Sequence, residues 1–167
     1  LPSLSALYAM ITKPAHLANL TFEQNLPETL LVDIGKDPGA LALLAYTLDE
    51  LYLLGGDSRT LTFKSYESIG GLHGAIGNRA KNTFDRLPAS AQAALPHVFA
   101  HLVEVDPAGR ASRKRAKLSE FSARLDAKQF IHAFIDARLL ISGTSTESVP
   151  IVEVAHEALF YNWDRLT

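Results

Sequence analysis

Residues 70–77 form a glycine-rich segment of the kind that can cradle a phosphate. The segment reads Gly-Gly-Leu-His-Gly-Ala-Ile-Gly. A phosphate-binding loop places Lys and then Ser or Thr after its last glycine, and a dinucleotide-binding turn follows the pattern G-x-G-x-x-G. Neither pattern is present, and no strand is predicted before the segment. We therefore expect the start of a helix here and no phosphate-binding loop within the chain.

Histidine is the next residue type whose spacing can do chemistry. His156-Glu157 begins like the zinc motif H-E-x-x-H, but Phe160 occupies the place of the second histidine, so the motif fails. His97 and His101 lie one helical turn apart with no carboxylate or cysteine nearby, and we expect a solvated or partly buried pair. The chain has no cysteine, and none of its serines lies in a G-x-S-x-G pattern. The sequence therefore predicts no catalytic residue and no metal site.

Positive charge is concentrated in residues 108–128, which hold seven basic side chains and two acidic ones. The net charge of this segment is therefore +5. Because the net charge of the whole chain is −2, the remainder of the chain has a net charge of −7. Such a run is most often a solvated face, and we expect no nucleic-acid binding from it. Five of the basic residues still define a candidate contact surface: Arg110, Arg113, Lys114, Arg115 and Lys117.

Composition places the chain among ordinary globular proteins. It has 167 residues, of which 47% are hydrophobic and 20% are charged. This length suits one sizeable domain or two small ones. The longest apolar run, residues 39–48, is about half the roughly 20 residues that a membrane-spanning helix needs, so we expect no membrane association. We expect a cytoplasmic protein, in keeping with the absence of cysteine.

Apolar residues recur at helical spacing through the first part of the chain. Pro14 is expected to end the first helix, because a proline disfavours helical geometry in the residue before it. Asp37 is expected to cap the third helix and Pro38 to occupy its first turn, while Gly55 breaks it. Pro96 predicts a late helix start or a kink. The predicted helices cover residues 4–13, 22–34, 38–54, 63–69, 72–86 and 95–102.

The second half of the chain has a different order of elements. A short helix at 118–121 and a longer one at 127–138 precede two strands at 139–141 and 151–154, and a last helix covers 156–165. Helix, short helix, helix and hairpin is the order of a winged helix. We therefore predict a mainly α fold, with a helical bundle over residues 1–71 and a winged-helix domain with a small β-hairpin over residues 72–167.

Three stretches together resemble one family. They are residues 37–44, residues 59–71 from Arg59 through Tyr66 to Gly71, and residues 152–166 with His156-Glu157. In this order they resemble the helical lid and winged helix of STAND proteins, which are signal-transduction ATPases with numerous domains. The likeness is greatest to the bacterial branch that is joined to WD-repeat propellers.

The resemblance implies a nucleotide site to which this chain contributes only part. An upstream phosphate-binding domain would bind ADP or ATP, and the lid and winged helix would fold over the nucleotide. Pro38 matches the lid proline that packs near the adenine, and His156 matches the winged-helix histidine that reaches the ADP phosphates. The implied role is that of a regulatory, non-catalytic fragment of a nucleotide-dependent switch, with ADP or ATP bound only in the full-length protein.

The resemblance also implies partners. Because the sequence opens with Leu1, we expect a piece of a longer protein, with the phosphate-binding ATPase domain before it and a repeat domain after it. Activation would release the winged helix for self-association. Two alternatives stay open: a winged-helix DNA-binding module, and a protein-interaction domain whose basic segment docks on an acidic partner.

Overall fold

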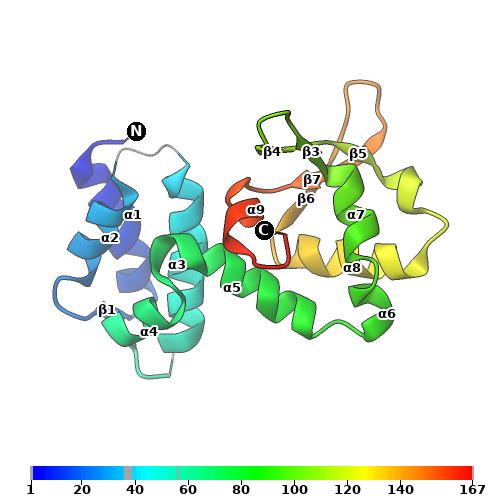
Figure 1. Ribbon diagram of the computed structural model, residues 1–167. Coiled ribbons are helices and arrows are strands. Elements are labelled where there is room, and N and C mark those ends of the chain that lie inside the picture. The colour runs from blue at the N-terminus through cyan, green and yellow to red at the C-terminus, as the bar shows by residue number, and fades with distance from the viewer. Residues whose placement is uncertain (1, 36–38, 56, 167) are drawn as a thin grey trace. The chain divides into compact units, whose positions relative to one another are not determined.

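The computed structural model describes residues 2–35, 39–55 and 57–166 (Figure 1). The chain divides into two compact units, an N-terminal unit of Leu1–Asn78 and a C-terminal unit of Arg79–Thr167. This division falls within helix α5 (Gly71–Asp85). The described residues are mainly helical, as the sequence predicts. None of the described helices is both long enough and apolar enough to cross a membrane.

The N-terminal unit is built mainly from helices (Figure 1). Its core is mainly aliphatic. The unit also contains one short parallel strand pair, with Thr21 opposite Thr60 and Phe22 opposite Leu61. Leucine and isoleucine side chains from successive helices fill the interior, as their helical spacing predicts. Its elements before α5 are α1 (Leu4–Leu17), β1 (Thr21–Phe22), α2 (Leu26–Ile34), α3 (Ala40–Gly55), β2 (Thr60–Leu61) and α4 (Phe63–Ser68).

Two predicted helix boundaries in this unit are wrong, and proline explains both. Helix α1 does not end at Pro14 but continues to Leu17, because a proline in the last turn removes only one hydrogen bond and its own carbonyl still accepts from the Ala18 amide at 3.0 Å. Helix α2 begins at Leu26, four residues later than predicted, because Pro27 occupies its first turn. The capping role predicted for Asp37 lies outside the described residues.

The glycine-rich segment starts a helix, as the sequence predicts. Gly70 lies in the turn between α4 and α5 and Gly71 is the first residue of α5, and their φ angles are +78° and +68°. Gly74 lies so close to the preceding turn that a Cβ there would be 2.6 Å from the Ile69 carbonyl oxygen. Glycine is therefore needed here for backbone conformation and close packing.

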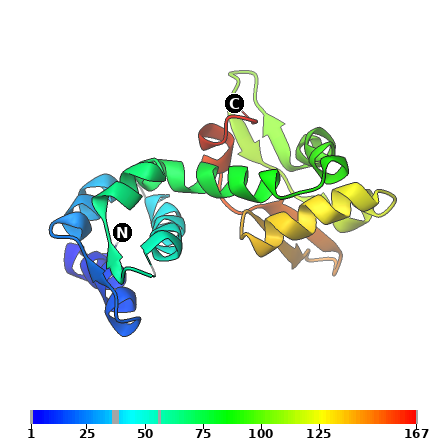
Figure 2. The same ribbon diagram turned by 90° about the horizontal axis from the view of Figure 1, so that it is seen from below.

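The C-terminal unit combines helices with two small antiparallel sheets (Figure 1 and Figure 2). The predicted hairpin is confirmed as β6 and β7, with Leu140 opposite Val154 and Thr144 opposite Pro150. A third strand, β5, pairs with the other edge of β7, and β3 and β4 form a separate hairpin. Its elements after α5 are α6 (Ala89–Gln92), α7 (Leu95–Leu102), β3 (Val103–Val105), β4 (Ala111–Arg113), β5 (Ala116–Lys117), the 3-10 helix η1 (Leu118–Phe121), α8 (Leu125–Asp136), β6 (Leu140–Thr144), β7 (Pro150–Val154) and α9 (Ala158–Asn162).

The core of the C-terminal unit is aromatic. Phe130 and Phe134 stack with their ring centroids 4.1 Å apart, and Trp163 lies 5.5 Å from Phe134. Phe84 and Phe99 contact Trp163 edge-on at 5.6 and 6.2 Å. Such pairs add to the free energy gained from burial alone, so this cluster ties α5, α7, α8 and the chain end into one core.

The C-terminal unit differs from the prediction in four features: helix α6, strand β5, the β3–β4 hairpin and the extent of the last helix. The β3–β4 hairpin is absent from the prediction, since the alternation of Val103, Glu104 and Val105 spans only three residues, and the side chains of both strands are mostly exposed. The last helix covers only Ala158–Asn162 rather than residues 156–165, because Trp163 turns to extended geometry and enters the core. Helix α7 begins at Leu95, where the predicted helix begins, and Pro96 lies in its first turn.

Candidate functional site

His156 lies in the short segment that connects the end of β7 at Val154 to the start of α9 at Ala158. The imidazole is half-buried, and its Nδ1 accepts a hydrogen bond from the Ala158 amide at 3.1 Å. Because Nδ1 is an acceptor, the neutral ring carries its proton on Nε2. We define the junction as residues 154–158. This hydrogen bond satisfies the first amide of α9 and fixes the His156 ring in one tautomer.

Arg113 of β4 donates hydrogen bonds to three residues of the junction. Its Nη1 donates to the Val154 carbonyl oxygen at 3.4 Å and to the Ala155 carbonyl oxygen at 3.3 Å. Its backbone amide donates to Glu157 Oε1 at 3.2 Å, and its Nε lies 3.9 Å from the same oxygen. The contacts of one arginine thus flank His156 on both sides.

Two further contacts fix the same segment. The Ala155 amide donates to the Leu139 carbonyl oxygen at 3.0 Å, which ties the junction to the residue before β6. The Tyr161 hydroxyl donates to the Ala111 carbonyl oxygen at 3.0 Å, which ties α9 to β4. The junction is therefore held between the β6–β7 hairpin and the β3–β4 hairpin.

The predicted basic surface is largely engaged within the chain. Besides Arg113, Arg115 pairs with Glu153 at 3.0 Å and Arg110 with Asp106 at 2.8 Å. Hydrogen bonds from the Arg110 amide and then its side chain hold the pKa of the Asp106 carboxyl below its usual range. The side chains of Lys114 and Lys117 are exposed and make no ion pair with any described residue.

Pro38, the other predicted nucleotide contact, lies outside the described residues. The structure therefore places one of the two residues that the resemblance assigns to the nucleotide, and that residue is His156. Among the described residues on either side of Pro38, α2 ends at Ile34 and α3 begins at Ala40.

A tyrosine organises the N-terminal unit near the turn at Gly70 and Gly71. The Tyr66 hydroxyl donates to Asp33 Oδ2 of α2 and accepts from the Leu72 amide of α5 at 3.0 Å. Burial, followed by the hydrogen bond to Asp33, raises the pKa of the Tyr66 phenol well above its ordinary value. One neutral phenol thus joins α2, α4 and the first turn of α5.

The paired histidines are partly buried, which is one of the two forms expected for them. The rings of His97 and His101 meet edge-on with centroids 4.8 Å apart, and both contact Phe121. His97 Nε2 is buried and has no hydrogen-bond partner among the described residues. No group of three or more metal-ligating side chains occurs in the described part of the chain.

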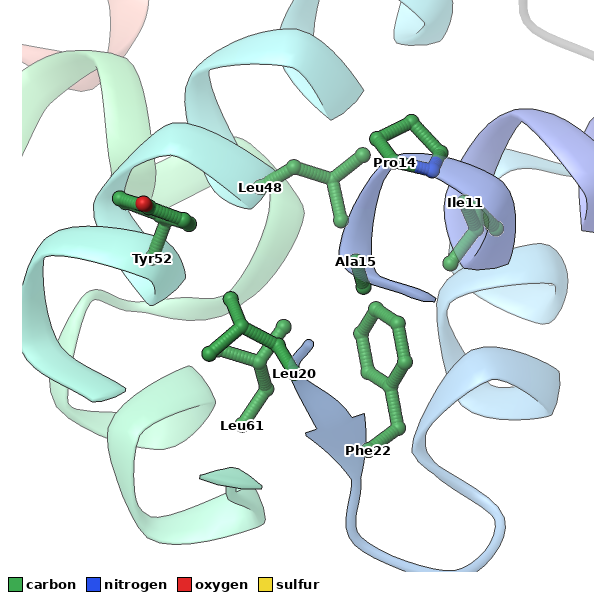
Figure 3. Close-up of a pocket in the computed structure, with 8 residues that line it drawn as sticks. All are labelled: Ile11, Pro14, Ala15, Leu20, Phe22, Leu48, Tyr52 and Leu61. Atoms are coloured by element: carbon green, nitrogen blue, oxygen red, sulfur yellow. The ribbon is translucent and has the colours of Figure 1, made fainter. Parts of the chain in front are cut away.

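The N-terminal unit also contains an apolar pocket of about 170 Å³ (Figure 3). Phe22 and Leu61 line it from the strand pair, while Leu48 and Tyr52 face it from α3 (Figure 3). The lining also includes Pro14 of α1 but carries no charged side chain. Such a pocket can take an apolar group, and the Tyr52 hydroxyl is the polar group of a side chain in its lining.

Sequence reasoning missed the contacts that give these residues their roles. Arg113 is 41 positions from Val154 and 44 from Glu157 in the chain, and Tyr66 is 33 from Asp33. No local pattern links residues so far apart. The one available signal was the concentration of arginines next to a strand, which fitted a solvated face equally well.

Comparison with known proteins places the chain in a family. A model of the family described as novel STAND NTPase 1 matches residues 2–167. No curated protein and no solved structure matches the chain. The family match covers the N-terminal unit, the C-terminal unit and the junction that carries His156. The chain therefore belongs to the novel STAND NTPase 1 family.

Proposed function

We propose that this chain is the regulatory, non-catalytic part of a nucleotide-dependent STAND switch. In this proposal its N-terminal unit is the lid, its C-terminal unit is a winged helix, and both contact ADP or ATP held by a phosphate-binding domain of the same polypeptide. Membership of a STAND NTPase family supports the nucleotide. The order α7, η1, α8 and the β6–β7 hairpin supports the winged helix.

The observation that carries the proposal is the state of His156. With Nδ1 accepting from the Ala158 amide, the neutral imidazole carries its proton on Nε2, and an N–H of this kind can donate to a phosphate oxygen. His156 would then bind ADP in the resting arrangement, with Pro38 packing near the adenine. Exchange for ATP would break these contacts and free the C-terminal unit for self-association. This requires the nucleotide to bind the two arrangements with different affinity.

The test is ADP release from the complete protein, followed with a fluorescent ADP. His156→Ala removes a hydrogen bond to a charged group, so release is expected to accelerate by about ten- to a hundredfold. His156→Asn is the informative second variant, because its side-chain oxygen still caps the Ala158 amide but it presents no imidazole N–H. Fast release in both variants supports the proposal.

Restoration of slow release by His156→Asn would mean that His156 only caps α9, and the nucleotide role would be abandoned. Unchanged release in His156→Ala would overturn the proposal as well. His132→Ala is the matched control, because His132 lies exposed on α8 and its loss should leave release unchanged.

Lys114 and Lys117 favour a second candidate, the winged-helix DNA-binding module. Their exposed side chains lack ion-pair partners among the described residues, whereas Arg110, Arg113 and Arg115 are engaged with carboxylates of the chain. This candidate predicts binding to duplex DNA that weakens steeply with salt and with Lys114→Gln and Lys117→Gln. No binding at low salt would remove it.

A further inference from the structure

Strand β6 forms one edge of the three-stranded sheet in the C-terminal unit, and no other strand of the described residues pairs with its outer side. At the two ends of this strand, the Leu139 carbonyl oxygen and the Ser145 amide bond across to residues that flank β7, at 3.0 and 2.9 Å. Alternate residues of an antiparallel strand face the same neighbour. Ser142 and Thr144 therefore turn their backbone amides and carbonyl oxygens away from β7, to the free edge.

This edge lacks the features that usually prevent a sheet from adding a further strand. Residues 140–144 read Leu-Ile-Ser-Gly-Thr and include neither a charged residue nor a proline. The opposite edge strand, β5, is only two residues long and carries Lys117. An unprotected row of backbone donors and acceptors is a template for an extended chain. The addition of a strand is therefore favoured at β6 and disfavoured at β5.

The outer face of the sheet is hollowed beside this edge. A hollow of about 200 Å³ is lined by Ile141, by Ser142 and by the ion pair of Arg115 and Glu153. A Cβ built on Gly143 would meet no atom within 4 Å, so the space above this residue is open. A side chain from an added strand can therefore lie over this face without displacing part of the chain.

An apolar groove of about 320 Å³ lies on the other face, between η1, α8 and Ser142. Its apolar lining comes from both helices, with Leu118, Phe121, Ile131 and Ile135. Ser142 lines the groove as well as the outer hollow, so the edge of β6 runs between the two. Successive side chains of a strand point to opposite faces. A strand added to β6 would therefore direct its side chains to the groove and to the outer hollow in turn.

Charge selects the occupant of the groove. Lys128 and His132 lie in its lining, which holds no carboxylate among the described residues. Lys128 is exposed and makes no ion pair with any described residue. An acidic side chain next to an apolar one is complementary to this lining. Antiparallel pairing of two β6 strands from two copies of the chain would instead bring both sets of basic side chains to one face of the joined sheet, which like charges disfavour.

We propose that the β6 edge binds an extended segment of a partner protein that carries an apolar and an acidic residue two positions apart. The backbone of this segment pairs with Ser142 and Thr144, and the apolar and acidic side chains occupy the groove beside Lys128. The alternate side chains of the segment lie over Ile141 on the outer face. This interaction goes beyond the nucleotide switch and uses none of its contacts.

The test selects heptapeptides from a random phage-displayed library on the full chain and measures the binding of the enriched peptides by fluorescence anisotropy. We expect the enriched sequences to carry an apolar and an acidic residue two positions apart. N-methylation of one alternating set of peptide amides should weaken binding at least about tenfold, because these amides face β6. N-methylation of the other set, which faces away from the strand, should change binding little.

A proline at the edge gives the matching test on the protein. Ser142→Pro removes an amide that faces the free edge and keeps the hydrogen bonds to β7, so binding should weaken about tenfold. Thr146→Pro is the matched control, because it places the proline in the turn between β6 and β7. There the Ser148 amide donates to the Ser145 carbonyl oxygen at 2.9 Å, and proline suits the second position of such a turn.

Charge reversal tests the chemistry of the partner. Lys128→Glu should weaken the binding of the enriched peptide about threefold to tenfold, and a peptide with lysine in place of its acidic residue should recover the loss. Lys64→Glu is the control for net charge, because Lys64 is exposed on α4 in the N-terminal unit. Trp163 fluorescence shows whether each variant keeps the folded core of the C-terminal unit.

Each other outcome overturns the proposal or part of it. Equal weakening by the two methylated sets, or full binding to folded Ser142→Pro, would overturn strand addition, and so would a library without enriched peptides. If Ser142→Pro does not fold, the methylated peptides decide. Dimerisation of the wild-type chain that Ser142→Pro abolishes would assign the edge to a second copy. Unchanged binding to Lys128→Glu would overturn the preference for an acidic segment.

Discussion

The two units of this chain reach stability with different side chains. The N-terminal unit packs leucine and isoleucine from its helices, and its polar organiser is the neutral phenol of Tyr66. The C-terminal unit contains Trp163 and every phenylalanine of the chain except Phe22 and Phe63. Two of its arginines bind the end of β7, Arg113 at the Val154 carbonyl oxygen and Arg115 at the Glu153 carboxylate. Each unit therefore has a core of its own composition, and Trp163 lies in the core of the C-terminal unit.

The largest effect is expected from the aromatic core. Phe130 is fully buried and contacts Phe84, Phe99 and Phe134. Phe130→Ala should lower the free energy of unfolding of the C-terminal unit by about 3–5 kcal/mol, because it removes apolar surface and leaves a cavity. Denaturant unfolding followed by Trp163 fluorescence measures it. Leu125→Ala, at a residue 80% exposed, is the control that should change little.

A smaller loss is expected from the tyrosine of the N-terminal unit. Tyr66→Phe keeps the ring but leaves the Leu72 amide and Asp33 without their partner, which should cost about 1–3 kcal/mol. Hydrogen exchange of α2 and α4 measures the loss, and exchange in the C-terminal unit should stay unchanged. Tyr52→Phe is the matched control, since Tyr52 is half exposed. Equal losses in both units would contradict their independence.

Alkaline pH should weaken the same contact. The pKa of Tyr66 is raised in the folded protein above the ordinary value of 10.0, so the phenol keeps its proton while the unfolded chain loses one. The contribution is complete below pH about 10 and declines as pH rises further. The difference in stability between wild type and Tyr66→Phe should therefore shrink above this pH. A difference that grows with pH would refute the assignment.

The smallest effect is expected in the β3–β4 loop. Asp106 accepts from the amides of Ala108 and Arg110, and its pKa is lowered, so its ionised form is favoured in the folded chain. This contribution is present above the ordinary carboxyl pKa and is lost as pH falls through the lowered value. Amide shifts of residues 108–110 followed by NMR should report that titration. Asp106→Asn should abolish it without moving the Trp163 signal.

The sequence predicted the helical parts well because their signals are local. The spacing of Leu44, Leu48 and Leu51 marks α3, and the polar stretch between Ile141 and Ile151 marks the β6–β7 hairpin. Boundaries near proline were less predictable, as Pro14 shows, because the cost of a proline depends on how much helix follows it.

The site was predictable only in part. His156 was identified by resemblance, whereas Arg113 was read as one charge among several on a surface. Its carbonyl and carboxylate contacts depend on where β7 and β4 meet, which no spacing in the sequence encodes. The same holds for Tyr66, whose partners come from α2 and α5.

In the proposed switch, the junction at residues 154–158 contacts ADP and loses this contact when ATP replaces it. The most direct measurement is hydrogen exchange of the Ala158 and Leu159 amides in the complete protein, with ADP and with a non-hydrolysable ATP analogue. We predict slower exchange with ADP than with the analogue, because in the proposed switch His156 contacts the nucleotide only in the resting arrangement. Equal exchange in the two nucleotide states would contradict the account.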